Sequence, residues 1–101
     1  MPAASRTPAK KPDLIDALLT LKSRGEIEAF LADLLTPGEV KALSERWLVA
    51  QLLDGGEYSY REIAERASSS TATVTRVARF LKDMPYRGYR RALDRLKGRR
   101  K

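Results

Sequence analysis

The stretch YREIAERASSSTATVTRVARFLK, residues 60–82, decides the fold, because it predicts two short helices joined by a tight turn. A capping box formed by Ser59 and Glu62 opens the first helix, which ends near Ala67. Three serines follow, and the second helix runs over residues 71–82. These proportions are typical of a helix-turn-helix, a unit that reads the major groove of DNA.

The side-chain pattern supports packing of these two helices on each other. Apolar or small residues stand at the positions where the helices would touch: Ile63, Ala64, Val74, Val77 and Leu81. The glycine that is usual in the turn is absent, and Ser68 stands near its place. A positive φ at Ser68 would cost ~1 kcal/mol, which a packed pair of helices tolerates. A plain helical hairpin without a role at DNA is the alternative interpretation.

The outer face of the second helix favours DNA over the plain hairpin. Its first turns carry small hydroxyl and methyl groups, which suit close approach to base edges and phosphates. No acid occurs between Arg66 and Lys82, and a helix N-terminus also presents free N–H groups to phosphates. Serines and threonines are also common as caps, an interpretation that covers Ser70 and at most Thr71 but not the whole set. The residues expected at the DNA are Ser70, Thr71, Ala72, Thr73, Thr75, Arg76, Arg79 and Lys82.

The rest of the chain also has helical apolar spacing, and no window alternates as a strand does. TPGE at residues 36–39, a capping box with proline at the first helical position, is the clearest helix start. The helix that follows has more than one apolar face, so we expect it to be central, and a DGG run at residues 54–56 ends it. The six helices expected of this all-α chain cover residues 14–24, 26–34, 37–53, 60–67, 71–82 and 86–96.

The composition of the 101 residues argues against several classes of protein. Without cysteine, the chain has no disulfide, no thiolate zinc site and no cysteine nucleophile. Without histidine, it lacks the commonest general base and metal ligand. Carboxylates such as Glu62 and Glu65 look like cap and surface residues on a short helix. We therefore expect no enzyme, no metal and no cofactor. No apolar run is long enough to cross a membrane, which predicts no membrane partner.

Charge is distributed unevenly along the chain, whose formal net charge is +7 and whose pI is about 10.1. Residues 13–53 carry seven acids and four bases, whereas residues 54–101 carry six acids and thirteen bases. A basic half predicts a polyanion as partner, and a merely solvated basic surface is the alternative. We expect a disordered basic arm over residues 1–12, a helix-turn-helix domain over residues 13–97 and a basic tail over residues 98–101.

Two longer motifs resemble a known family. LTPGEVKALSERW at residues 35–47 and YREIAERASSSTATVTR at residues 60–76 resemble the tryptophan repressor (TrpR) superfamily, and more closely its YerC/YecD-type branch of bacterial proteins. The resemblance extends over residues 14–97. It implies an all-helical, intertwined homodimer whose N-terminal helices interlock and whose helix-turn-helix units face successive major grooves. It also implies that Arg61 meets the DNA backbone and that the start of the second helix approaches the bases.

The resemblance further implies an effector pocket, in which two arginines flank a bound amino acid. The positions that match it are Leu35, Thr36, Arg46, Arg76, Val77 and Phe80. Val77 stands in place of a glycine, Phe80 in place of a serine and Asp33 in place of a leucine. A valine and a phenyl ring fill much of an indole-sized space, which argues against tryptophan as effector. Either Phe80 plugs the pocket and the protein needs no effector, or a small molecule of different shape binds.

The two pocket arginines also have an interpretation without a ligand. Arg46 is expected to pair with a nearby acid such as Glu45 or Asp33, and Arg76 to contact phosphate.

The expected function is a homodimeric, sequence-specific transcriptional regulator that binds palindromic double-stranded DNA in the bacterial cytoplasm, on the nucleoid. A nucleoid-associated or architectural protein with little sequence preference is the alternative, which the basic tails and the arginine-rich last helix favour. A protein-interaction module, with its charge serving solubility, is the alternative outside DNA binding. Substituting Arg76 and Thr75 with alanine separates that module from a DNA-binding protein, because only DNA binding should be lost.

Overall fold

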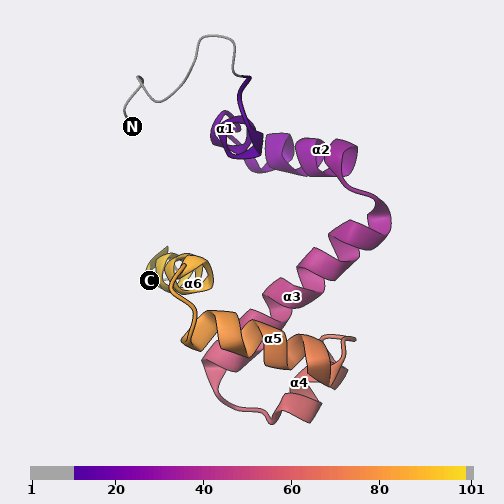
Figure 1. Ribbon diagram of the computed structural model, residues 1–101, viewed down its shortest axis with the longest axis vertical. Helices are drawn as coiled ribbons and strands as arrows, with labels where there is room; N and C mark the ends of the chain where they lie inside the picture. The colour runs from indigo at the N-terminus through magenta and orange to yellow at the C-terminus, as the bar shows by residue number, and fades with distance from the viewer. Residues whose placement is uncertain (1–10, 100–101) are drawn as a thin grey trace. The chain divides into compact units, whose positions relative to one another are not determined.

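The computed structural model describes residues 11–99, which form six α-helices and no strand (Figure 1). The helices are α1 (Leu14–Leu19), α2 (Arg24–Leu34), α3 (Pro37–Gly55), α4 (Tyr60–Arg66), α5 (Thr71–Lys82) and α6 (Gly88–Arg99). The chain divides into two compact units, Met1–Thr36 and Pro37–Lys101, and each is described by itself. The prediction of an all-α chain with six helices is confirmed. Residues 1–10 of the expected arm and residues 100–101 of the expected tail lie outside the described part, so the domain limits stay a prediction.

The N-terminal unit contains α1 and α2, and side-chain caps set where each helix begins. In the capping box of α1, the Asp16 N–H donates to Asp13 at 2.9 Å and the Asp13 N–H donates to Asp16 at 2.9 Å. Ser23 caps α2 by accepting the Glu26 N–H at 3.2 Å. Because Ser23 starts a new helix, α1 ends at Leu19, earlier than the predicted end near residue 24.

This unit has no core of its own. None of its described residues is buried, although its helices carry eight large aliphatic or aromatic side chains at helical spacing. Five of the side chains on these two helices are more than two-fifths exposed: Leu14, Ile15, Leu19, Ile27 and Leu34. Exposed apolar surface of this extent on two adjoining helices is typical of an interaction surface.

The C-terminal unit holds the hydrophobic core, in which α3, α4 and α5 pack on one another (Figure 1). The buried cluster consists of Val49, Ala50, Ile63, Ala64, Ala67, Val74 and Val77. The predicted contact positions of the α4–α5 pair are thereby confirmed, with Leu81 half-buried beside them. The Trp47 ring on α3 stacks on the Tyr89 ring at a centroid distance of 6.4 Å, and so α6 is tied to the same core. At the end of α3, Gly56 adopts φ 74°, the left-handed conformation predicted for the DGG run.

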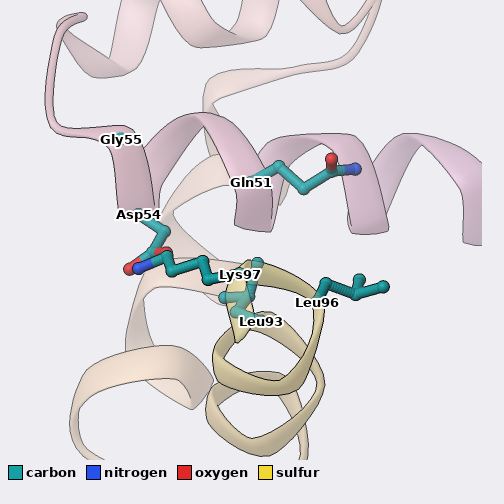
Figure 2. Close-up of a pocket in the computed structure, with 6 residues that line it drawn as sticks. All are labelled: Gln51, Asp54, Gly55, Leu93, Leu96 and Lys97. Carbon is teal, nitrogen blue, oxygen red and sulfur yellow. The ribbon is translucent and has the colours of Figure 1, made fainter. Parts of the chain in front are cut away.

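A small ion-pair cluster joins the last turn of α3 to α6. The Asp54 carboxylate accepts hydrogen bonds from the Arg90 guanidinium at 2.9 Å and from the Lys97 ammonium at 2.7 Å, and only 12% of its side chain is exposed. Arg90 also binds Asp94 at 2.9 Å. Figure 2 shows Lys97 reaching Asp54 at the edge of a cleft of about 320 Å³, which Gln51, Gly55, Leu93 and Leu96 also line. The two cations offset the unfavourable placement of a carboxylate at a helix C-terminus.

We expect Asp54 to make the stability of this protein sensitive to acid. The hydrogen bond from Lys97, followed by that from Arg90, holds the pKa of Asp54 below its ordinary value, although burial opposes this. A lowered pKa contributes stability above the unfolded-state pKa near 3.9, and that contribution is lost as the pH falls through the lower folded-state pKa. Asp54→Asn should reduce the free energy of unfolding at pH 7 by about 1–2 kcal/mol, between the values for exposed and buried pairs. Urea unfolding at pH 7 and pH 3 measures this, with exposed Asp33→Asn as control, and equal losses in both variants would contradict it.

Candidate nucleic-acid interface

Helix α4 is held in place at both ends. The Ser59 hydroxyl accepts the Glu62 N–H at 3.1 Å, and the Ser59 N–H donates to the Glu62 carboxylate at 2.8 Å. The hydrogen bond from the Ser59 backbone lowers the pKa of Glu62, so this carboxylate stays charged at the positive end of the helix. At the other end, the Arg66 guanidinium lies 4.0 Å above the Tyr58 ring. Arg61, expected at the DNA backbone, lies on this anchored helix and is exposed.

The turn between α4 and α5 is tight and contains one residue in the left-handed region. Ser68 adopts φ 53° at the place where the sequence lacks a glycine. The Ser69 N–H donates to the Ala64 carbonyl at 2.8 Å, which closes the turn back onto α4. The backbone strain expected at Ser68 is therefore present, and the hydrogen bond and the buried helix contacts hold the turn against it.

Ser68→Gly should raise the free energy of unfolding by up to about 1 kcal/mol, because glycine adopts this φ without a clash of its side chain. Ser69→Gly is the matched control, because Ser69 has no positive φ and a glycine there only adds freedom to the unfolded chain. Urea unfolding of both variants measures the difference. If Ser68→Gly were no more stable than Ser69→Gly, the assignment of strain to Ser68 would be wrong.

The start of α5 uses two of the residues expected at the DNA as caps. The Ser70 hydroxyl accepts the Thr73 N–H at 3.1 Å and donates to the Thr73 hydroxyl at 3.1 Å. Thr73 is half-buried, whereas Thr71 and Ala72 are exposed at the helix end. The structure therefore gives Ser70 and Thr73 a definite role in ordering the first turn of α5.

The outer face of α5 carries the other candidate residues. Val74, Val77 and Ala78 are buried on one side of the helix. Helical geometry places the exposed set on the opposite side and along its edges: Thr71, Ala72, Thr75, Arg76, Arg79 and Lys82. This face combines three small side chains with three cations in 12 residues, and no acid lies on the helix.

A cleft of about 300 Å³ joins the start of α4 to the outer face of α5. It is lined by Tyr60, Thr75, Ala78, Arg79, Lys82 and Asp83. Tyr60 was not among the residues predicted to meet DNA, because tyrosines next to apolar residues at helix starts favour core or interface packing. Tyr58 and Tyr89 pack against the core, whereas Tyr60 and Tyr86 are exposed. The feature of the sequence that could have indicated Tyr60 is its position as the first residue of α4, next to Arg61.

Comparison with known proteins settles the family. The family model described as Trp repressor protein matches residues 10–97. This chain belongs to the Trp repressor family. YerC of Bacillus subtilis is 38% identical over 84 residues, which are 83% of this chain and 79% of that protein. A Trp operon repressor homolog of Actinobacillus succinogenes is 44% identical over 71 residues, 69% of each chain. The crystal structure of a TrpR-like protein from Eubacterium eligens matches with a TM-score of 0.76 and 39% identity over 83% of this chain and 84% of that one.

In this Trp repressor family member, the residues that match an effector pocket are divided between the two units. Leu35 and Thr36 belong to the N-terminal unit, and the other four to the C-terminal unit. Val77 is 1% exposed and lies in the core, while the Arg76 guanidinium lies 4.7 Å above the Phe80 ring. The Arg76 guanidinium therefore already has an aromatic contact within its own helix.

Glu45, one of the acids expected to pair with Arg46, pairs with Lys41 one turn earlier on α3. Over residues 11–99, no cluster of three or more acidic side chains could hold a metal ion, and no helix is both long and apolar enough to cross a membrane.

Proposed function

We propose that this protein is a sequence-specific DNA-binding regulator of transcription that acts as a homodimer, with α4–turn–α5 as its helix-turn-helix. The observation that carries the proposal is the outer face of α5, which is exposed, basic and rich in small hydroxyl and methyl groups. The protein's membership of the Trp repressor family supports the same function. Such a regulator acts on the chromosome, in the bacterial cytoplasm.

The proposed contacts fall into two groups. Thr71, Ala72 and Thr75 approach base edges in the major groove, where small side chains allow the backbone of α5 to come close. The cations neutralise phosphates on either side of the groove and fix the register of the protein on the duplex. The residues in this second group are Arg61, Arg76, Arg79 and Lys82, with the Tyr60 hydroxyl beside them. Ser70 and Thr73 act by holding the first turn of α5 in shape.

The homodimer is proposed because the N-terminal unit buries none of its described residues. Helix α3 adds exposed Val40, Leu43 and Leu48 to the apolar surface that needs cover. A second copy of the chain supplies the same surfaces in return, as a two-fold interface requires. The cleft between α3 and α6, with the apolar side chains of Leu93 and Leu96, is one surface on which such a copy can dock (Figure 2).

Substituting Ile15 and Leu19 with serine should shift the protein from dimer to monomer, because both side chains are exposed in the single chain. The matched control replaces exposed Thr20 and Asp33 with serine and should remain dimeric. Sedimentation velocity over a range of protein concentrations measures the oligomeric state. A wild-type protein that sediments as a monomer would contradict the proposal, as would a dimer that both variants retain.

We further propose that tryptophan is not the effector. The Val77 side chain packs into the core and Phe80 already occupies one face of Arg76. A ligand that binds only the folded protein raises its melting temperature by mass action. Adding millimolar L-tryptophan should therefore change neither the melting temperature nor the affinity for DNA, and a rise in either would refute this part.

Selection of bound duplexes from a random-sequence pool is the test of the proposed function. A dimeric regulator should enrich a palindromic sequence that binds at least about 1,000-fold more tightly than bulk DNA. Binding should also weaken steeply with salt, by ~0.9 log units per log unit of salt for each phosphate neutralised. A pool without any enriched sequence would favour an architectural DNA-binding protein instead.

A further inference from the structure

The cleft of about 300 Å³ that joins the start of α4 to the outer face of α5, termed the α4–α5 cleft, contains an acid beside its cations. Tyr60 and Thr75 bring hydroxyl groups to it, and Arg79 and Lys82 bring cations. All four side chains donate hydrogen bonds, as contacts to DNA phosphates require. Asp83 is the single acid among the described residues that line the cleft. Its carboxylate only accepts hydrogen bonds, and its charge has the same sign as that of a phosphate.

The Asp83 carboxylate is exposed and has no partner within residues 11–99. The ion pairs of this part of the chain involve other acids, and no side-chain hydrogen bond reaches Asp83. Arg79 lies four residues earlier, a spacing that permits an ion pair on a helix, but none forms. The Asp83 backbone N–H donates to the Arg79 carbonyl at 2.8 Å, so the residue is held in place while its carboxylate faces solvent.

The place of Asp83 in α5 is unfavourable for an acid. Asp83 is the C-cap of the helix, where the helix dipole favours cations and disfavours carboxylates. Asp54 occupies a similar place in the last turn of α3, but Arg90 and Lys97 offset its charge there. Asp83 has no such compensation within the described chain. A residue that breaks a local rule without a local gain is typical of a functional position, so folding does not explain this carboxylate.

Repulsion between a carboxylate and a phosphate acts differently on specific and on non-specific binding. Unrelated duplexes bind through phosphate contacts alone, in many alternative positions on the protein. A fixed negative charge in the cleft weakens every position that brings a phosphate close to it. The selected duplex is instead held in one position by contacts to base edges. Thr75, which is proposed to make such a contact, lines the same cleft as Asp83 and so fixes where the duplex lies relative to the carboxylate.

We propose that Asp83 is a specificity-determining residue, whose carboxylate in the α4–α5 cleft weakens the binding of unrelated duplexes. This inference rests on the proposed function of α5. Arg79 and Lys82 attract any duplex, and Asp83 lowers that attraction unless the base contact of Thr75 positions the phosphates away from it. Specificity is a difference between two affinities, and a group that repels the wrong partner raises it as a new contact to the right partner does.

Substituting Asp83 with asparagine tests this proposal. Affinity for an unrelated duplex should rise about tenfold, because a dimer loses two carboxylates and each like-charge contact at a protein surface changes affinity about threefold. Affinity for the selected duplex should rise no more than about twofold, so the preference for it falls about fivefold. The difference between the variant and wild type should shrink as salt is raised, because salt screens exposed charges. Fluorescence anisotropy with both duplexes over a salt series measures these changes.

Two further variants and the melting temperature serve as controls. Asp83→Glu keeps the charge and should keep most of the wild-type preference. Asp33→Asn removes the same charge from an exposed position of the N-terminal unit and should bind both duplexes like wild type. The melting temperature of Asp83→Asn should equal or slightly exceed that of wild type, because the substitution removes an acid from a helix C-terminus.

An unchanged affinity of Asp83→Asn for the unrelated duplex would overturn the proposal. An equal rise for both duplexes would also overturn it, because Asp83 would then weaken binding without selecting between duplexes. A similar rise in Asp33→Asn would make net charge responsible, and a loss of affinity for the selected duplex would show that the carboxylate binds that duplex directly. All four results contradict the role of Asp83 and leave the proposed function in place, whereas a wild-type protein that prefers no duplex overturns both.

Discussion

Substituting Thr75 and Arg76 with alanine should lower the affinity for the selected duplex about 30- to 1,000-fold, equivalent to about 2–4 kcal/mol. Both side chains are exposed on the outer face of α5, so their loss removes contacts to DNA without opening the core. Removing the Arg76 side chain also removes its contact with the Phe80 ring, but Arg76 is exposed, so no buried contact is lost. Fluorescence anisotropy with the selected duplex and with an unrelated duplex measures the affinity and the preference between them.

The matched control for this pair is Thr20→Ala with Arg24→Ala, which removes the same two residue types from exposed positions in the N-terminal unit. We expect the control to keep its preference for the selected duplex. The α5 variant should lose most of that preference while its melting temperature stays close to that of wild type. If the two variants bound the selected duplex equally well, α5 would not be the reading helix.

Ile63→Ala should reduce the free energy of unfolding by about 2–5 kcal/mol, which is a large part of the stability of a small domain. The Ile63 side chain is 1% exposed and lies in the core cluster between α3, α4 and α5. Its truncation leaves a cavity beneath α5, the helix proposed to read DNA. Urea unfolding followed by circular dichroism measures the loss.

Ile63→Val is the graded control for the cavity, because it removes one methylene group and should cost about 0.5–1.5 kcal/mol. A loss below 1 kcal/mol for Ile63→Ala would mean that the contact between α4 and α5 does not depend on this side chain. Similar losses for both variants would show that the site relaxes around the missing atoms.

Local signals were sufficient to predict most of the fold. The Ser59 and Glu62 capping box and the spacing of Ile63, Val74 and Val77 predicted the α4–α5 pair, because caps and apolar period depend on residues close in sequence. The end of α1 was misplaced because Leu21 continues the apolar spacing beyond Leu19, while Ser23 starts a new helix. The apolar spacing favours a longer first helix, whereas Ser23 favours a new helix start. The hydrogen bond from the Glu26 N–H to Ser23 shows that the new helix forms.

The candidate interface was less accessible from sequence. Exposure of Thr75, Arg76 and Arg79 follows from helical geometry, so it was predictable. The cleft that brings Tyr60 to Thr75 depends on how α4 crosses α5, which no local pattern specifies. The same holds for the pairing of Asp54 with Lys97, which lie in helices far apart in the chain.

The exposed apolar surface of α1 and α2 has a consequence for how the activity of this protein depends on its abundance in the cell. If two chains must meet before either is complete, the amount of assembled protein at low abundance grows with the square of the amount synthesised. A twofold change in gene dosage then alters occupancy of a DNA site about fourfold. Control of transcription by this chain would have a threshold, below which scattered copies have no regulatory effect.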